Sequence, residues 1–118
     1  MRLAALVLGM IAMHAGAAPT YRAQMTGAQL VHDMRADPGI GFNSERRERA
    51  MGYIAGVMDS TAGVQWCPAG RMLPHELNYL LIDDIESLEP AKLEQNAAPI
   101  ILAALAKKYP CNSVGAKR

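Results

Sequence analysis

The chain is 118 residues long, 51% hydrophobic and 19% charged, and its formal net charge is +1 at pH 7. This length allows one domain of ordinary size and leaves no material for a second core. The near-balance of charges argues against a nucleic-acid-binding protein, which would need a basic surface.

The first feature along the chain is an N-terminal export signal. Arg2 gives a positive start, residues 3–13 are apolar and uncharged, and Ala15-Gly16-Ala17 matches the small-x-small pattern of a signal-peptidase site. The apolar run is shorter than the ~20 residues that span a bilayer. It therefore predicts a cleaved signal peptide over residues 1–18, followed by one helical domain over residues 19–118, periplasmic and without membrane insertion.

Two helices are expected in the first half of the mature domain. Thr26 and Gln29 form a capping box that begins a helix over residues 27–35, and an Asp-Pro-Gly sequence ends it. Ser44 is the expected N-cap of a second helix that reaches about Val64.

The second helix carries two faces that are both expected to pack. One is an apolar stripe made by Ala50, Tyr53, Ile54, Val57, Thr61 and Val64. The other gathers Gly52, Gly56 and Asp59. Since glycine inside a helix costs ~1 kcal/mol relative to alanine, the two glycines predict that another backbone comes close. A neighbouring helix of the same chain is the favoured interpretation, and a second subunit of a homodimer is the alternative.

Two further helices follow a loop that contains proline and glycine. Pro74 suits the first turn of a third helix that ends near Leu88. Its expected buried face consists of Leu77, Leu80, Leu81, Ile85 and Leu88. After a single turn at residues 91–95, Asn96 is expected to cap a fourth helix that Pro110 ends. No segment of useful length alternates with the period of a strand, so the predicted fold is an all-α bundle of four to five helices.

The only two cysteines, Cys67 and Cys111, predict a structural disulfide. An oxidising compartment favours pairing them. A ring closed over the residues between them stabilises the domain by roughly 4 kcal/mol in the loop-entropy model. The bridge would tie the loop after the second helix to the end of the fourth.

No pattern in the sequence is typical of an enzyme or of a cofactor site. The mature chain has only His32 and His75, on different predicted helices, and neither HExxH nor CxxC spacing occurs. A metal site made by His75, Asp83 and Asp84 would spread its ligands over two turns. We therefore predict a protein without catalytic residues, metal or cofactor.

Two adjoining parts of the chain are candidate surfaces for a protein partner. The third helix is acidic on its outward side, and the loop before it carries polar and aromatic side chains. The predicted contact residues are Gln65, Trp66, Arg71, His75, Glu76, Asp83 and Glu86. The alternative is that the acidic residues only form a solvated helix face.

Several short segments follow one another in a recognisable order. They are Thr26-Gly27-Ala28-Gln29-Leu30, Gly52-Tyr53-Ile54-Ala55-Gly56-Val57-Met58-Asp59, Cys67-Pro68, and Ala103-Ala104-Leu105 running into Tyr109-Pro110-Cys111. Their order and spacing resemble the Rap/Tai family of type VI secretion immunity proteins over nearly the whole mature domain. Family members commonly carry two more cysteines, where this chain has Met34 and Ala50. Two apolar residues in mutual contact would replace that bridge.

The resemblance implies a periplasmic and often dimeric helical protein that blocks a peptidoglycan amidase injected by related bacteria. Inhibition in such families is steric, because a loop or helix occupies the cleft that holds the catalytic cysteine of the amidase. Two other classes are weighed against this hypothesis. One is an acid-stress periplasmic chaperone of the HdeA-like kind, which is also small, helical and tied by one disulfide. The other is a general protein-interaction module of the cell envelope.

Overall fold

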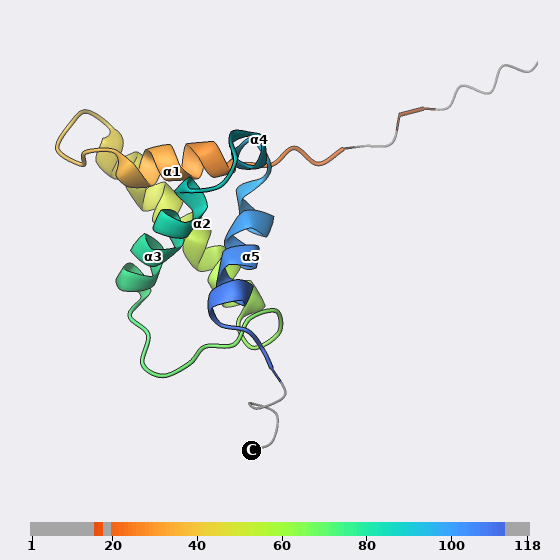
Figure 1. The fold of residues 1–118 in the computed structure, drawn as a ribbon. Helices are drawn as coiled ribbons and strands as arrows, with labels where there is room; N and C mark the ends of the chain where they lie inside the picture. The colour runs from red at the N-terminus through yellow and green to blue at the C-terminus, as the bar shows by residue number, and fades with distance from the viewer. Residues whose placement is uncertain (1–15, 18–19, 113–118) are drawn as a thin grey trace, which may run out of the picture.

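A computed structural model describes residues 16–17 and 20–112. These residues form five helices: α1 (Gly27–Arg35), α2 (Asn43–Thr61), α3 (Pro74–Glu86), α4 (Pro90–Leu93) and α5 (Ala97–Lys108). The predicted all-α bundle is confirmed (Figure 1). The predicted signal peptide lies outside the described residues, apart from Gly16 and Ala17. Within the described part of the chain, no helix is both long and apolar enough to cross a membrane.

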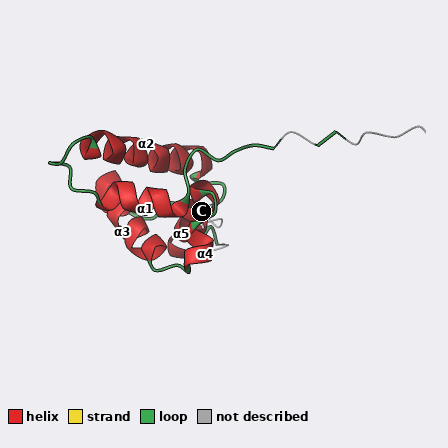
Figure 2. Ribbon diagram, turned by 90° about the horizontal axis from the view of Figure 1, so that it is seen from above, coloured by secondary structure: helices red, strands yellow, loops and turns green. Residues whose placement is uncertain are grey.

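The helices pack around one shared core. α1 packs against α2 and α3, and α5 packs against the same two helices. Seen from above, α2 runs along one side of the molecule and α1 lies between it and α3 (Figure 2). The buried apolar side chains come from every helix except α4: the helical ones are Leu30, Met34, Ala50, Ile54, Leu77, Leu81, Ile82, Ile85, Ala97, Ile100, Ile101 and Leu105.

Two of the expected helix caps are confirmed. The hydroxyl of Thr26 accepts a hydrogen bond from the N–H of Gln29 at 3.2 Å, and the side chain of Asn96 accepts one from the N–H of Ala98 at 3.3 Å. Each satisfies a backbone donor that a helix leaves unpaired in its first turn. Pro74 is in the first turn of α3, where its missing N–H costs nothing.

The second helix is shorter than expected at its C-terminus, and its N-cap, Phe42, lies two residues before the expected one. It starts at Asn43, so Ser44 is its second residue rather than its cap. It ends at Thr61, because the chain turns extended at Ala62 and then adopts a positive φ of 77° at Gly63. Val64 therefore lies beyond the helix, with 77% of its surface exposed, and its placement on the apolar stripe is wrong.

The buried face of α3 is rotated from the expected one. Leu77, Leu81 and Ile85 are buried as predicted, four residues apart on one line of the helix. The second buried line is Asn78 and Ile82, so Leu80 is left 45% exposed. Leu88 is 36% exposed and lies beyond Glu86, the last residue of the helix. The sequence pattern favours the wrong line because Asn78 is polar and Leu80 is apolar.

The glycine face of α2 has no neighbour among the described residues. A Cβ added to Gly52 or to Gly56 would meet nothing within 4 Å, and both residues are exposed. The favoured interpretation, a close helix of the same chain, is therefore wrong. Gly27 is the glycine that packs tightly: a Cβ there would lie 2.8 Å from Cδ1 of Ile100 and 3.1 Å from the carbonyl oxygen of Leu93.

The start of α1 is tied to the start of α5. The N–H of Gly27 donates to the carbonyl of Gln95 at 3.0 Å, and the N–H of Ala97 donates to the carbonyl of Met25 at 3.0 Å. These bonds form an isolated antiparallel bridge between the two N-cap residues. The close approach explains the need for glycine at position 27.

The two residues at which the resemblance implies a further cysteine pair are both in the core. Met34 on α1 and Ala50 on α2 are 2% and 0% exposed. Both therefore belong to the buried apolar surface that joins the two helices.

Candidate functional site

The predicted disulfide is present. The sulfur atoms of Cys67 and Cys111 are 2.10 Å apart, and the bridge closes a sequence separation of 44 residues. Beside it, the N–H of Cys67 donates to the carbonyl of Tyr109 at 2.9 Å. The loop between α2 and α3 is thereby fixed to the end of α5, as the sequence predicts.

Trp66 anchors the same loop from the inside. Its side chain is 3% exposed, and its indole N–H donates to the hydroxyl of Thr61 at 3.0 Å. Its ring centre is 6.2 Å from that of Tyr109. The carbonyl of Trp66 accepts from the N–H of Gly63 at 2.8 Å. Trp66 is therefore a positioning residue of the loop, and its side chain is not available on the surface as a partner contact.

The remaining loop residues lie on the surface. From Cys67 the chain makes a wide arc at the edge of the molecule before it enters α3 (Figure 1). Gln65, Arg71, His75 and Glu76 are all exposed, the last two in the first turn of α3. Residues 65–76 thus contain five of the seven predicted contact residues. Four of them are exposed, and the fifth, buried Trp66, holds the start of the segment together with the disulfide.

A shallow hollow separates this loop from α3. Its volume is about 120 Å³. The residues that line it come from the loop, the first half of α3 and the end of α5, and they are Ala69, Arg71, Met72, Leu73, Glu76, Leu77, Leu80 and Tyr109. The side chain of Leu80, which the packing of α3 leaves half outside, forms part of this hollow rather than of the core.

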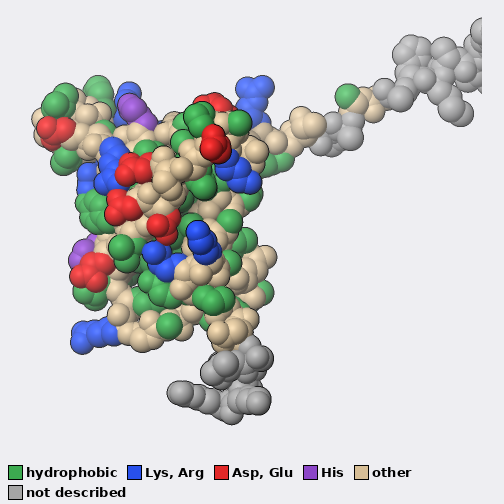
Figure 3. All heavy atoms as spheres, in the orientation of Figure 1, with side chains coloured by type: hydrophobic (Ala, Val, Ile, Leu, Met, Phe, Trp, Pro, Cys, Tyr) green, Lys and Arg blue, Asp and Glu red, His purple; other side chains and the backbone are tan. Residues whose placement is uncertain are grey.

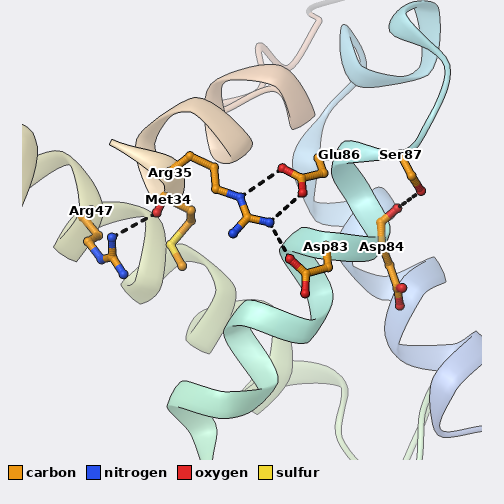
Figure 4. A network of polar contacts seen from close by, with 7 residues as sticks. All are labelled: Met34, Arg35, Arg47, Asp83, Asp84, Glu86 and Ser87. Atoms are coloured by element: carbon orange, nitrogen blue, oxygen red, sulfur yellow. Dashed lines mark hydrogen bonds and ion pairs between the residues drawn. The ribbon is translucent and has the colours of Figure 1, made fainter. Parts of the chain in front are cut away.

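The acidic face of α3 is partly neutralised by Arg35 of α1. The guanidinium donates to both carboxylate oxygens of Glu86, at 3.0 and 2.6 Å, and also to Asp83 (Figure 4). The hydrogen bonds of Glu86 and then of Asp83 raise the pKa of the Arg35 guanidinium. No local sequence signal marks this contact, because the partners of Arg35 lie 51 and 48 residues further along the chain.

A second ion pair lies on the side of α3 that faces α5. The carboxylate of Asp84 is 3.2 Å from the ammonium of Lys108 on α5. Three of the carboxylates of α3 are thus paired within the chain. Figure 3 shows the result on one side of the molecule, where acidic and basic side chains lie side by side. Asp83 and Glu86 remain exposed, but a binding partner at this place would also meet the positive charge of Arg35.

The junction of α1 and α2 holds one buried carboxylate. Asp33 is 2% exposed, and its oxygens lie 3.1 Å from Nδ1 of His32 and 3.3 Å from Nη2 of Arg49. Arg47, two residues before Arg49 on α2, lies over the ring of Tyr79 of α3 with its guanidinium carbon 5.3 Å from the ring centre. The contacts of Arg49 and Arg47 thus join α2 to α1 and to α3, whereas His32 and Asp33 are neighbours within α1.

No group of three or more metal-binding side chains is found within residues 16–17 and 20–112. His32 and His75 lie on α1 and α3. The candidate site therefore consists of the exposed loop fixed by the disulfide and the adjoining first turn of α3.

Two comparisons with known proteins bear on the identity of this surface. The family model described as Rap1a immunity proteins matches residues 26–111, which span all five helices and both cysteines. The comparison with curated proteins gave no match.

Proposed function

The chain belongs to the family of Rap1a immunity proteins, and on this basis we propose that it is a periplasmic inhibitor of a toxin delivered by type VI secretion. The toxin that the proposal names is a peptidoglycan amidase. The observation that carries the proposal is the family match over residues 26–111. It favours an immunity protein over the acid-stress chaperone and over a general envelope module.

The disulfide supports the proposed compartment. Protein disulfides persist in oxidising environments such as the bacterial periplasm and are rare in the cytosol. The bridge between Cys67 and Cys111 joins two segments that also share a backbone hydrogen bond, so the fold places the two thiols together.

We propose the loop from Gln65 to Glu76 as the element that contacts the toxin. It presents the exposed side chains of Gln65, Arg71, His75 and Glu76, and its start is held by the disulfide and by buried Trp66. A loop that is already ordered loses less conformational entropy when it binds. Steric occupation of the active-site cleft would then need no chemistry from this chain.

The test is direct inhibition. The chain and a candidate periplasmic amidase are produced separately, and peptidoglycan hydrolysis is measured with rising amounts of the chain. Arg71→Glu and Glu76→Lys reverse charges within the loop and are expected to weaken inhibition by tenfold or more. Arg46→Glu, on an exposed position of α2, is the matched control. Neither binding nor inhibition by the native chain, together with no protection of cells that make the toxin, would overturn the proposal.

A homodimer is a separate part of the proposal. The exposed face of α2 with Gly52, Gly56 and Asp59 has no neighbour within the described chain, so a second subunit is the alternative that remains for it. Light scattering after gel filtration gives the mass in solution. A dimer that Gly56→Arg converts to a monomer would support this interface, whereas a native monomer would rule it out.

A further inference from the structure

A second hollow lies on α3 and α5, away from the loop. It occupies about 220 Å³ beside the last turn of α3. Its apolar lining is Ile85, Leu88, Ile100, Ala103 and Ala104. The exposure of Leu88, which the sequence pattern assigns to the core, is explained by its place in this lining.

The charged residues of this hollow are mostly basic. Lys92 of α4 and Lys107 of α5 line it, and neither takes part in an ion pair among the described residues. The only acid in its lining is Asp84, which pairs with Lys108 at 3.2 Å. The exposed acids Glu89 and Glu94 belong to the same short segment as Lys92 but do not line the hollow.

We propose that this hollow receives an apolar side chain flanked by carboxylates on the surface of the toxin. The inference rests on the proposed function and names a second contact for the same partner. Ligand sites for drug-sized molecules occupy roughly 300–1,000 Å³, so a hollow of about 220 Å³ suits a single anchoring side chain better. The unpaired ammonium groups of Lys92 and Lys107 favour a partner that carries acidic residues around that anchor.

The acidic residues of α3 do not oppose this choice of partner. Arg35 and Lys108 already pair with Asp83, Asp84 and Glu86. Charges without a partner attract an incoming protein more than charges that are neutralised locally. The hollow on α3 and α5 therefore points to an acidic partner surface.

Charge reversal tests the role of the lysines. In the double variant Lys92→Glu/Lys107→Glu, we expect the association rate constant with the amidase to fall at least fivefold at low salt. The effect should shrink at ~0.5 M salt, because exposed charges are then screened. The control Arg22→Glu/Arg46→Glu makes the same change in net charge at two exposed positions outside the loop and the hollow. An unchanged rate in the lysine variant would overturn the proposal.

Filling the hollow tests the anchor. Ala103 is an exposed residue of α5 that lines the hollow, and Ala103→Phe should raise the Kd for the amidase at least tenfold at any salt concentration. Ser44→Phe adds the same ring at an exposed position in the first turn of α2 and is the control. Unfolding curves of all variants must match the native curve, so that a loss of affinity is not a loss of fold.

A probe that needs no toxin separates this inference from the proposed function. Three capped pentapeptides are titrated to millimolar concentration and followed by amide NMR shifts: Gly-Glu-Phe-Glu-Gly, the same with Lys for Glu, and the same with Ser for Phe. We expect only the first to shift the amides of Leu88, Ala103 and Lys107. Equal shifts with the basic peptide, or none with the acidic one, overturn the inference. If the acidic peptide binds there but no amidase binds the chain, the proposed function fails and the acidic specificity of the hollow stands.

Discussion

The hydroxyl of Tyr53 on α2 donates a hydrogen bond to Oδ1 of Asn96, the N-cap residue of α5, over 3.1 Å. The same oxygen accepts from the N–H of Ala98 at 3.3 Å. One side-chain oxygen therefore both begins α5 and joins it to α2. Tyr53 belongs to the Gly-Tyr-Ile segment on which the family resemblance depends, so this contact gives that segment a structural role.

Replacing the phenol tests this link. Tyr53→Phe keeps the ring and removes the donor, and we expect a loss of about 1 kcal/mol in the free energy of unfolding. Guanidinium denaturation followed by the fluorescence of Trp66, the single tryptophan, measures it. Tyr21→Phe, at a residue that is 80% exposed, shows what removal of a solvent-exposed hydroxyl does.

The same variant should also change the dependence of stability on pH. Burial raises the pKa of Tyr53 above its ordinary value of 10.0, because a charged phenolate is disfavoured there. The unfolded chain then releases this proton at a lower pH than the folded chain does. The stabilisation is complete below about pH 10 and is lost as the pH rises further. Tyr53→Phe should unfold with a smaller loss of stability between about pH 8 and about pH 11, and an unchanged loss would contradict the assignment.

The disulfide should carry a large share of the stability. The double variant Cys67→Ser/Cys111→Ser is expected to lose roughly 4 kcal/mol, since its unfolded chain is no longer constrained by the ring. Native protein with reductant should unfold like the variant, and the variant should not respond to reductant. Two free thiols in the exported native protein, detected by mass spectrometry without reductant, would show that the disulfide does not stabilise it.

Replacement by alanine should lower the free energy of unfolding at Gly27 and raise it at Gly52 and Gly56. Gly27→Ala places a Cβ against Ile100 and the backbone of Leu93, and such overpacking costs about 1–3 kcal/mol. Gly52→Ala and Gly56→Ala meet no described neighbour and should each stabilise the monomer by about 0.4–1 kcal/mol, because alanine restricts the unfolded chain. Thermal unfolding compares the three. Destabilisation at position 52 or 56 would show that another backbone does approach α2.

Trp66 should prove structural. Trp66→Ala removes a buried side chain and is expected to cost about 3–5 kcal/mol, whereas Trp66→Phe keeps much of the apolar volume and loses the hydrogen bond to Thr61. Circular dichroism follows the unfolding of both variants, since they lack the fluorescent indole. If Trp66→Ala is as stable as the native protein but binds the toxin poorly, the indole acts at the interface instead.

Local signals in the sequence are enough for much of the fold. Thr26 and Asn96 cap helices through their own side chains within three residues, so the sequence around them determines where α1 and α5 begin. Likewise, only two cysteines are present, and one pairing is possible. The caps depend on residues close together in the sequence, and the disulfide depends on the number of cysteines. Neither prediction needs the tertiary arrangement.

The surface could not be derived in the same way. The positions of α1 and α5 determine which leucines in and just after α3 face outward. For this reason Leu80 and Leu88 line hollows and do not belong to the core. The burial of Trp66 depends on Thr61 and Tyr109, and the pairing of Asp83 depends on Arg35 far along the chain. An aromatic residue in a loop and an acid on a helix look exposed until these neighbours are known.

The pairing of Met25 and Gly27 with Ala97 and Gln95 also limits when the domain can close. Synthesis delivers the N-terminal residues first, so the residues of α1 are made before Gln95 and Ala97, which pair with its start. Cys67 is likewise made before its disulfide partner Cys111, which follows α5. A growing chain therefore stays open at both places until its last helix has emerged, and a truncation before Gln95 would leave the start of α1 without its mate.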